Sequence, residues 1–392
     1  MTTKRKLLFV SNNMNIGGVQ KALCNLLKEI SDNYEITLFL FNSTGVYMND
    51  LPEKIKVLTC KGPYRYFGIS QGECKTFTDR IIRGFFAALT KTVGRDFVVK
   101  LMNLFQKPIK DEYDFAISCF QNGIKNSFYG GCNDFVLCKT KAKQKITFLH
   151  CDYGLCGANY EENNNKYKKF DKIAACSDGC KKAFMRCLNI NPQKVFTVNN
   201  CNDFDAIRKL ADTDTLIYDE SEINVITVAR LAHEKGIERA LEAVRNAVES
   251  GVEVKYHLVG DGDKKNELQK LCHNLGIEKH VVFHGNSSNP YKYMKKADLL
   301  LVSSYHEAAP MVIDEARCLG VPILSTETTS SQDMIIDNDS GWVCENSQEG
   351  ISELLYEIVS QKDLLMQKKQ QMQKKEVNNN IAVQQFHDML KN

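Results

Sequence analysis

The sequence predicts an α/β protein with two tandem Rossmann-like domains, each a doubly wound parallel sheet, facing a central cleft. The chain has 392 residues, and at about 100 to 200 residues per domain this length favours two domains. Short apolar segments rich in β-branched and aromatic residues alternate with helical patterns, as is typical of βαβ units. The alternation starts again after a polar stretch at residues 211–223, so the same architecture is expected twice.

The amino-terminal half opens with the apolar segment KLLFV, which becomes polar at Ser11. This segment is too short for a signal peptide, and we interpret it as the first strand. A helix is expected over residues 18–30. The strands expected after it are YEITLFLF, KIKVL, YDFAIS, KITFLH, KIAACS and KVFTVN.

The carboxy-terminal half repeats this pattern, with one long helix that runs to residue 249. Its expected strands are INVITVAR, VKYHLVG, VVFHG, DLLLVS and VPILS. We place the two domains at residues 1–205 and 206–376. The last helix, about residues 377–392, is expected to pack back on the amino-terminal domain.

The composition is that of an ordinary globular protein, with 43% hydrophobic and 25% charged residues. No stretch approaches the ~20 apolar residues that a membrane-spanning helix needs. A net charge of +3 is too small to indicate nucleic-acid binding. The 15 cysteines are scattered, odd in number and without a C-x2-C pair, so reduced thiols in a cytoplasmic protein are expected rather than disulfides.

Two acidic residues follow a buried strand in the segment SSYHEAAPMVIDEARCLGVP. Ligands bind at the carboxyl ends of parallel strands, where Glu307 lies in the expected loop. Pro310 is suited to open the next helix, and Glu315 then falls in its second turn, so both carboxylates can face the same cleft. Taken alone, a helix N-terminal acid and a solvated helix residue would explain the pair equally well.

Two basic residues flank another strand exit, because INVITVAR delivers Arg230 to a carboxyl end and Lys235 follows in the loop. Such a pair suits a diphosphate, since a charge-assisted hydrogen bond contributes about 1.5 to 3 kcal/mol. We therefore expect Arg230 and Lys235 to dominate phosphate binding. In the alternative interpretation, Arg230 pairs with a local acid and Lys235 is merely exposed.

Two glycine turns also follow strands. Gly17 and Gly18 open the first helix, and Gly260 begins the turn GDG after VKYHLV. Small residues at such turns let backbone amides approach an anion at a helix N-terminus. Neither turn has the full G-x-G-x-x-G pattern or a phosphate loop ending in G-K-S/T, which disfavours a dehydrogenase or an ATPase.

The motifs together resemble the family 4 glycosyltransferases, which have the GT-B fold, use nucleotide sugars and retain the anomeric configuration. The resemblance includes that family's E-x7-E pair, Glu307 and Glu315, and its basic pair, Arg230 and Lys235. It is dense in the carboxy-terminal half, in VARLAHEKG, VGDGDKKNEL, VFHGNSSNPYKYMKKADLLLVSS, SSYHEAAPMVIDEARCLGVPIL and SGWVC. It is thinner in the amino-terminal half, in NIGGVQKALCNLL, YDFAIS, TFLHCDY, AACSDGCKKAF and VNNCND.

The resemblance implies that residues 206–376 bind the nucleotide-sugar donor and residues 1–205 the acceptor. It makes Glu315 the acid that holds the donor ribose and Glu307 the acid near the transferred sugar. Arg230 and Lys235 become the diphosphate clamp. Further donor contacts are expected from Gly260 and from the backbone of Ala308, Ala309, Pro310, Met311 and Val312.

In the amino-terminal half the resemblance makes Gly17 and Gly18 the loop that approaches the diphosphate. His150 resembles the histidine near the donor sugar, and it ends the strand KITFL at the expected rim of the cleft. A lone rim histidine is more often structural, so we expect a sugar-hydroxyl contact rather than a general base. The family usually has glycine where Ala308 follows Glu307, which leaves the identity of the sugar open.

No metal and no cofactor are expected beyond the nucleotide-sugar substrate. The pattern D-x-D occurs four times at scattered positions, without the oxygen-rich cage that magnesium or manganese needs. The basic pair can neutralise the diphosphate instead. In front-face transfer the leaving diphosphate accepts the proton of the incoming hydroxyl, and the protein stabilises developing phosphate charge.

The segment from Phe77 to Lys110 has seven cations against two acids, and its apolar residues recur about every fourth position. Basic amphipathic helices can lie in an anionic membrane surface, where a lipid-linked acceptor would be found. A helix pair packed on the amino-terminal sheet explains the pattern equally well. Gly84 and Gly94 are expected to interrupt any long helix here.

We therefore expect a cytoplasmic hexosyltransferase, peripheral to the inner face of the membrane, that uses a UDP-sugar and a lipid-linked saccharide acceptor in surface polysaccharide assembly. Two other functions stay open. A nucleotide-sugar 2-epimerase would have the same fold and the same kind of cleft. A degenerate transferase could serve as a scaffold or partner subunit, although a decayed site would not need to keep both acids and both cations.

Overall fold

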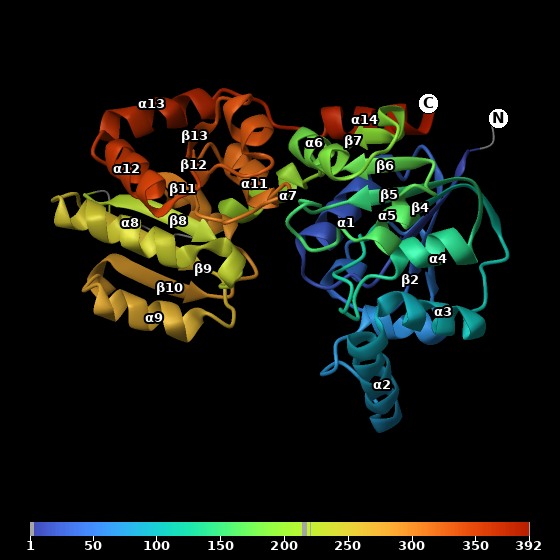
Figure 1. The fold of residues 1–392 in the computed structure, drawn as a ribbon. Coiled ribbons are helices and arrows are strands. Elements are labelled where there is room, and N and C mark those ends of the chain that lie inside the picture. The colour runs from blue at the N-terminus through green and yellow to red at the C-terminus, as the bar shows by residue number, and fades with distance from the viewer. Residues whose placement is uncertain (1–3, 214–217, 220, 392) are drawn as a thin grey trace. The chain divides into compact units, whose positions relative to one another are not determined.

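The protein is described by a computed structural model that covers residues 4–213, 218, 219 and 221–391. The chain divides into two compact units (Figure 1). The amino-terminal unit extends to Cys201 and also contains the final segment from Asn379. The carboxy-terminal unit comprises Asn202–Asn378. This division lies four residues before the boundary expected after residue 205, so helix α7 (Phe204–Ala211) belongs to the carboxy-terminal unit.

The amino-terminal unit is built on a parallel sheet, whose described strands have the order β3-β2-β1-β4-β5-β6-β7. These strands are β1 (Lys6–Ser11), β2 (Glu35–Leu40), β3 (Lys56–Thr59), β4 (Glu112–Ser118), β5 (Lys141–Leu149), β6 (Lys172–Ala175) and β7 (Val195–Thr197). Its helices are α1 (Gly18–Ile30), α2 (Phe77–Val93), α3 (Arg95–Phe105), α4 (Cys132–Lys139), α5 (Glu161–Tyr167), α6 (Asp178–Cys187) and α14 (Asn380–Lys391). Short 3₁₀ helices lie at η1 (Val46–Met48), η2 (Pro63–Gly68) and η3 (Pro192–Lys194). Every strand expected in this half is confirmed, and α1 has the predicted bounds.

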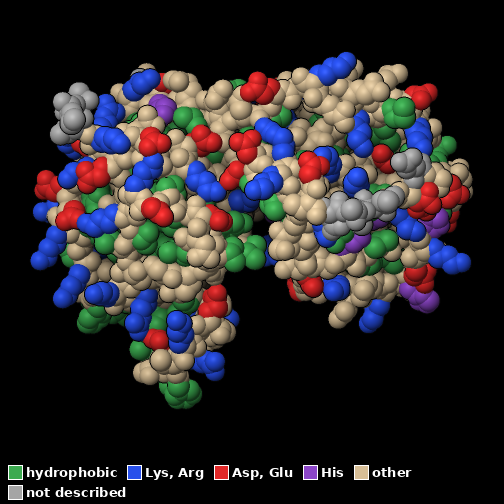
Figure 2. Space-filling model, turned by 180° about the vertical axis from the view of Figure 1, so that it is seen from behind, with side chains coloured by type: hydrophobic (Ala, Val, Ile, Leu, Met, Phe, Trp, Pro, Cys, Tyr) green, Lys and Arg blue, Asp and Glu red, His purple; other side chains and the backbone are tan. Residues whose placement is uncertain are grey.

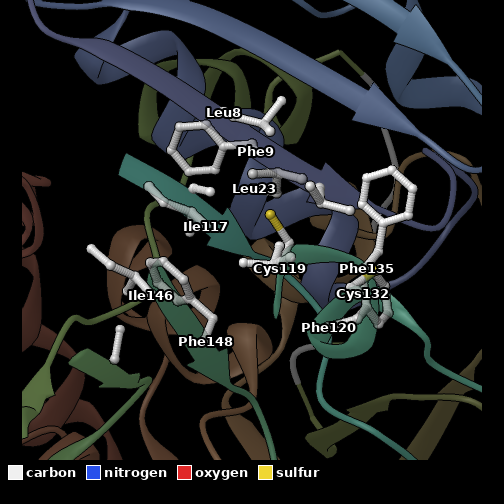
Figure 3. Close-up of a cluster of buried hydrophobic side chains, with 14 of the residues drawn as sticks. Leu8, Phe9, Leu23, Ile117, Cys119, Phe120, Cys132, Phe135, Ile146 and Phe148 are labelled. Atoms are coloured by element: carbon white, nitrogen blue, oxygen red, sulfur yellow. The ribbon is translucent and has the colours of Figure 1, made fainter. Parts of the chain in front are cut away.

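The core of this unit lies between the central strands and the helices that follow them (Figure 3). Phe9 of β1 and Ile117 of β4 are completely buried in it. The last helix, α14, joins the same core, since Phe386 stacks on Phe9 with ring centroids 6.2 Å apart. Lys172 also donates a hydrogen bond of 2.7 Å to the carbonyl of Met389. The carboxy-terminal helix therefore packs on the amino-terminal unit.

The interruption of the helix that was expected at Gly84 does not occur. Helix α2 continues through Gly84 without interruption, because its Thr76 cap and its apolar contacts offset the cost of one internal glycine, about 1 kcal/mol. Gly94 does separate the two helices, and its φ of 85° is a conformation that favours glycine.

The carboxy-terminal unit has a second parallel sheet, whose described strands have the order β10-β9-β8-β11-β12-β13. They are β8 (Ile223–Val228), β9 (Val254–Val259), β10 (Val281–Gly285), β11 (Leu299–Val302), β12 (Ile323–Thr326) and β13 (Gly341–Cys344), of which β13 was not predicted. Besides α7, the helices are α8 (Ile237–Glu249), α9 (Lys265–Asn274), α10 (Tyr291–Lys296), α11 (Met311–Leu319), α12 (Gln348–Val359) and α13 (Lys362–Gln373). Shorter helical turns are η4 (His233–Lys235), η5 (Glu278–His280) and the π-helix η6 (Gln332–Ile336).

The second sheet buries both of its faces. Val225 of β8 belongs to one core cluster, together with apolar residues of α8 and α12. The next residue, Ile226, belongs to another cluster, with residues of α11. Such two-sided burial explains why these strands are continuous apolar runs. Among the described residues, no helix combines the length and hydropathy that crossing a membrane requires.

Candidate active site

A pocket of about 280 Å³ lies in the carboxy-terminal unit at the carboxyl ends of β8 and β11. These two strands are neighbours, although they are far apart in the sequence, because the strand order reverses between them. Ligands of open α/β sheets bind at such a reversal point. The lining residues are Thr227, Val228, Ala229, Lys235, Leu300, Leu301, Val302, Ser303, Ser304, Glu307 and Val312.

An ion pair closes one side of this pocket. The Nζ of Lys235 lies 2.6 Å from Oε1 of Glu307, and their side chains are 24% and 12% exposed. The Ser304 hydroxyl donates a second hydrogen bond of 2.7 Å to the same carboxylate oxygen. Lys235 and Glu307 were both predicted site residues, and the structure brings them together. A partly buried ammonium of this kind interacts more strongly with an anion than an exposed one does.

Arg230 is near this pocket but is not one of its lining residues. Its side chain is 70% exposed and pairs with Glu234, one turn along in η4. Lys235 lines the pocket and Arg230 does not. The alternative interpretation is therefore correct for Arg230, which pairs with the local acid Glu234. It is wrong for Lys235, which is partly buried and paired with Glu307. Arg230 remains at the same strand exit, where a long exposed side chain is free to reorient toward a ligand.

The loops that carry these residues are joined through their backbones. The amide of Tyr305 donates to the carbonyl of Glu234 at 3.0 Å, and the Ser303 hydroxyl donates to the carbonyl of Lys235 at 3.0 Å. Gly236 has a φ of 56°, and a Cβ there would lie 2.3 Å from the carbonyl oxygen of Ser303. The positions of Lys235 and Glu307 are therefore coupled through backbone geometry that only glycine permits.

Arg239 of α8 is a positioning residue that the sequence did not reveal. It is 6% exposed, and its guanidinium donates to the carbonyl of Ser303 at 2.5 Å and to Asn346 Oδ1 at 2.8 Å. The guanidinium carbon also lies 3.9 Å from the ring centroid of Tyr305. An arginine within an amphipathic helix looks like a surface residue, so no local pattern distinguished it.

Close backbone packing explains why residue 260 is a glycine. Its φ is 145°, and a Cβ there would lie 1.9 Å from the carbonyl oxygen of Ala229. The loop after β9 is thereby pressed against the loop after β8, where Leu231 donates from its amide to the carbonyl of Asp261 at 3.0 Å. Whether Gly260 also contacts a phosphate stays a prediction.

Helix α11 begins directly after Pro310, as expected. Glu315 lies in its second turn and is only 6% exposed. Met311 and Ile313 anchor the helix in the core. The first turn therefore points its backbone amides toward the edge of the sheet that bears the pocket, where Val312 is a lining residue.

The predicted residues of the amino-terminal unit occupy the carboxyl end of its own sheet. Gly17 is the N-cap of α1, and no side chain caps that helix end. A Cβ added to Gly18 would meet nothing within 4 Å. The diphosphate contact that the resemblance implies for Gly17 and Gly18 stays a prediction.

His150 follows β5 and lines a second pocket, of about 310 Å³, in the amino-terminal unit. The pocket is mainly apolar, and its lining includes Leu23, Cys119 and Phe148. These three residues belong to the buried core cluster that Figure 3 shows. The imidazole is stacked on Phe148 with ring centroids 5.6 Å apart. Burial in this environment lowers the pKa of His150 to about 4. The ring is therefore neutral at pH 7 and able to form hydrogen bonds without a charge.

The carboxy-terminal pocket is lined by one basic and one acidic side chain, Lys235 and Glu307. Within the described ranges, no group of three or more His, Cys, Asp or Glu residues could hold a metal ion. Lys235 and Arg230 are the cations placed at the β8 exit. Metal independence remains a prediction.

The part of the chain that bears the pocket matches a known protein family. The profile described as "Glycosyl transferases group 1" matches residues 212–380, which include the pocket. This part of the chain belongs to the glycosyl transferases group 1 family. The matched residues are nearly coextensive with the carboxy-terminal unit, so the family signature lies where the sequence motifs are densest.

Curated relatives match in part. The lipopolysaccharide glucosyltransferase WaaG of Escherichia coli (strain K12) is 33% identical over 134 residues, which are 34% of this chain and 36% of WaaG. An N-acetylgalactosamine-N,N'-diacetylbacillosaminyl-diphospho-undecaprenol 4-alpha-N-acetylgalactosaminyltransferase of Campylobacter jejuni is 28% identical over 184 residues, which are 47% of this chain and 49% of that enzyme. The chain thus spans about half or less of the length of these relatives.

Solved structures match over the whole chain. HepE of Anabaena in complex with UDP has a TM-score of 0.69 at 16% identity, covering 98% of this chain and 99% of HepE. The complex of HepE with UDP-glucose has a TM-score of 0.66 at 17% identity and covers 99% of both chains. At this identity the likeness concerns the fold, and it confirms the predicted GT-B class of two Rossmann-like domains.

Proposed function

We propose that the protein is a retaining glycosyltransferase that moves a hexose-type sugar from a UDP-sugar to a saccharide acceptor in surface polysaccharide or glycan assembly. One observation carries the proposal. The Lys235–Glu307 pair lies at the strand-order reversal of the carboxy-terminal sheet, inside the region that matches the family. The names of the relatives support it, since WaaG is a glucosyltransferase and HepE binds UDP-glucose.

In this proposal the diphosphate of the donor binds at the β8 exit. A diphosphate carries more negative charge than the carboxylate of Glu307, so it competes for the Lys235 ammonium. Arg230 exchanges its exposed pair with Glu234 for a phosphate contact. The backbone N–H groups of Ala308, Ala309, Met311 and Val312, just before and at the start of α11, add hydrogen bonds to sugar and phosphate oxygens. Glu315 holds the ribose.

The transfer step needs stabilisation of the charge that develops on the leaving diphosphate, which Lys235 and Arg230 supply. The diphosphate accepts the proton of the incoming hydroxyl. Glu307 contacts the transferred sugar and keeps Lys235 in place. His150 is a hydrogen-bonding residue, because an imidazole with a pKa of about 4 is a weak base at neutral pH.

The acceptor in this proposal is a lipid-linked saccharide at the inner face of the membrane. The diphospho-undecaprenol named for the Campylobacter relative supports this choice. The amino-terminal unit supplies the acceptor site, and its His150 pocket offers a mainly apolar wall with three uncharged polar side chains, those of His150, Asn199 and Asn200.

The test is turnover of UDP-glucose, UDP-galactose and UDP-N-acetylglucosamine with and without polyprenyl-diphosphate-linked sugar acceptors. The proposal predicts UDP release that depends on the acceptor and a product with retained anomeric configuration. Conversion of the donor to its C2 epimer without an acceptor would identify an epimerase. The scaffold function would be favoured if no donor were consumed and no nucleoside diphosphate bound.

A further inference from the structure

Helices α2 and α3 present a row of apolar side chains to solvent. Seven of them expose between 52% and 78% of their surface: Phe77, Ile81, Phe85, Val93, Phe97, Leu104 and Phe105. On α2, three of the seven recur every fourth residue and form one stripe. Two partly buried residues of α2, Phe86 and Leu89, pack against the core. The exposed stripe is therefore additional to the face that holds α2 on the unit.

The two acidic side chains of α2 and α3, Asp79 and Asp96, have partners within the amino-terminal unit. Asp79 accepts hydrogen bonds from Arg65 at 2.7 Å and from the Thr76 hydroxyl at 2.8 Å. Asp96 pairs with Lys166 and also lies 3.9 Å from buried Arg95. Both carboxylates are thus neutralised by cations of the unit. They contribute little negative charge to the outer surface.

The exposed charge of the pair is positive. Arg80, Lys91 and Lys100 are exposed, and none of them pairs with a carboxylate in the described part of the chain. They lie between the exposed apolar residues along both helices. Helix α2 protrudes from the amino-terminal unit, with hydrophobic and basic side chains on its surface (Figures 1 and 2). The surface made by these ten residues is here called the α2–α3 face.

The α2–α3 face is anchored to the ligand-binding edge of the amino-terminal sheet. Asn13, in the loop between β1 and Gly17, donates to the carbonyl of Gly68 at 2.8 Å. Asn15 in the same loop donates to Glu73 Oε1 at 3.0 Å. Residues 68–73 lead directly into α2. The α2–α3 face is therefore tied to the loop that opens α1.

We propose that the α2–α3 face docks the protein on an anionic lipid membrane. Aromatic and aliphatic side chains interspersed with cations suit the boundary between anionic headgroups and acyl chains. A second copy of the chain is a poorer occupant, because an isologous contact would bring two copies of the same basic surface, with Arg80, Lys91 and Lys100, against each other. The inference stands on the surface alone, so it and the proposed function can fail independently.

The test is sedimentation of the full chain with vesicles of phosphatidylglycerol and phosphatidylcholine in equal parts, and with phosphatidylcholine alone. The wild-type protein should pellet with the anionic vesicles and much less with the neutral ones. Each cation near an anionic surface contributes about 1 kcal/mol, or about fivefold. The triple variant R80Q/K91Q/K100Q should therefore lower the partition coefficient roughly a hundredfold.

Two further variants make the test specific. F77S/I81S/F85S should lose about tenfold or more for each inserted side chain while keeping its cations. The control K270Q/K279Q/K374Q removes three exposed cations from the carboxy-terminal unit and should pellet like the wild type. Unchanged UDP-dependent thermal stabilisation, or unchanged circular dichroism, shows that each variant is folded.

Three results would overturn the inference. The wild-type protein could stay in the supernatant with anionic vesicles. The K270Q/K279Q/K374Q control could lose as much binding as R80Q/K91Q/K100Q, which would indicate a general charge effect. Finally, F77S/I81S/F85S could abolish self-association in sedimentation velocity and leave vesicle binding unchanged, which would make the face a subunit interface.

Discussion

The two units use the carboxyl ends of their sheets in different ways. The carboxy-terminal pocket is held by an ion pair, by glycines at close backbone contacts and by buried Arg239. The amino-terminal pocket is mainly apolar, with one neutral histidine, and its neighbouring helices expose hydrophobic side chains. In the proposed function, the difference teaches that binding a diphosphate requires a fixed arrangement of charges, whereas binding the acceptor does not.

The largest effect should come from Glu307→Gln. The amide keeps the size of the side chain but loses the charge that holds Lys235 and that, in the proposed function, contacts the transferred sugar. We expect turnover to fall by roughly a hundredfold or more, while UDP binding is retained or tightened because Lys235 is released. Steady-state kinetics and nucleotide titration check this. A variant with full turnover would remove Glu307 from the site.

The next largest effect is a difference in stability between substitutions in the two glycine loops. Gly260→Ala places a Cβ against the Ala229 carbonyl at a φ that favours glycine, so the carboxy-terminal unit should lose about 1 to 3 kcal/mol or more of stability. Gly18→Ala enters open space at the start of α1 and should leave stability unchanged or slightly raised. Denaturant unfolding measures the free energy of unfolding of both variants. An equal loss of stability in the two would contradict the packing explanation of Gly260.

These glycines also show what could be predicted from the sequence. Apolar periodicity is local, so all the strands expected in the amino-terminal half and the bounds of α1 followed from it. The Lys235–Glu307 contact joins residues 72 positions apart, and only the family motif pointed to both. Arg239 carried no motif and looked like a surface residue. Its role depends on the Ser303 carbonyl, a long-range contact that periodicity does not encode.

Two features of the amino-terminal unit could not be predicted, because they depend on tertiary contacts. The interruption expected at Gly84 did not occur, because tertiary contacts of Phe86 and Leu89 outweigh one glycine's helix propensity. The environment of His150 also arises from segments far apart in the sequence, α1, β4 and residues 199–201. A rim position could be predicted for this residue, and its apolar surroundings could not.

A smaller effect is expected for Arg239→Ala, which removes the link between α8 and the Ser303 carbonyl. Since Arg239 touches no ligand in the proposal, the loss acts through the positions of Lys235 and Glu307. We expect donor KM and kcat to worsen together by about tenfold, with partial rescue in Arg239→Lys. Kinetics of both variants measure it. A loss of stability with unchanged kinetics per folded molecule would make the residue purely structural.

The smallest effect concerns His150 and pH. Its pKa is lowered from 6.5 to about 4 in the folded state, so between these values the unfolded chain binds more protons. Its contribution to stability is therefore complete above pH 6.5 and is lost as the pH falls toward 4. His150→Gln should flatten this part of the stability profile, measured by thermal unfolding at a series of pH values. An unchanged slope would show that His150 titrates normally.

The central claim is that the carboxy-terminal pocket binds the diphosphate of a nucleotide through Lys235. The direct measurement is calorimetric titration of UDP, GDP and ADP into the wild-type protein, Lys235→Ala and the exposed control Lys270→Ala. The account predicts binding of UDP, weakened about tenfold to a hundredfold by Lys235→Ala and unchanged by Lys270→Ala. Binding of no nucleotide, or equal affinity in Lys235→Ala and wild type, would contradict it.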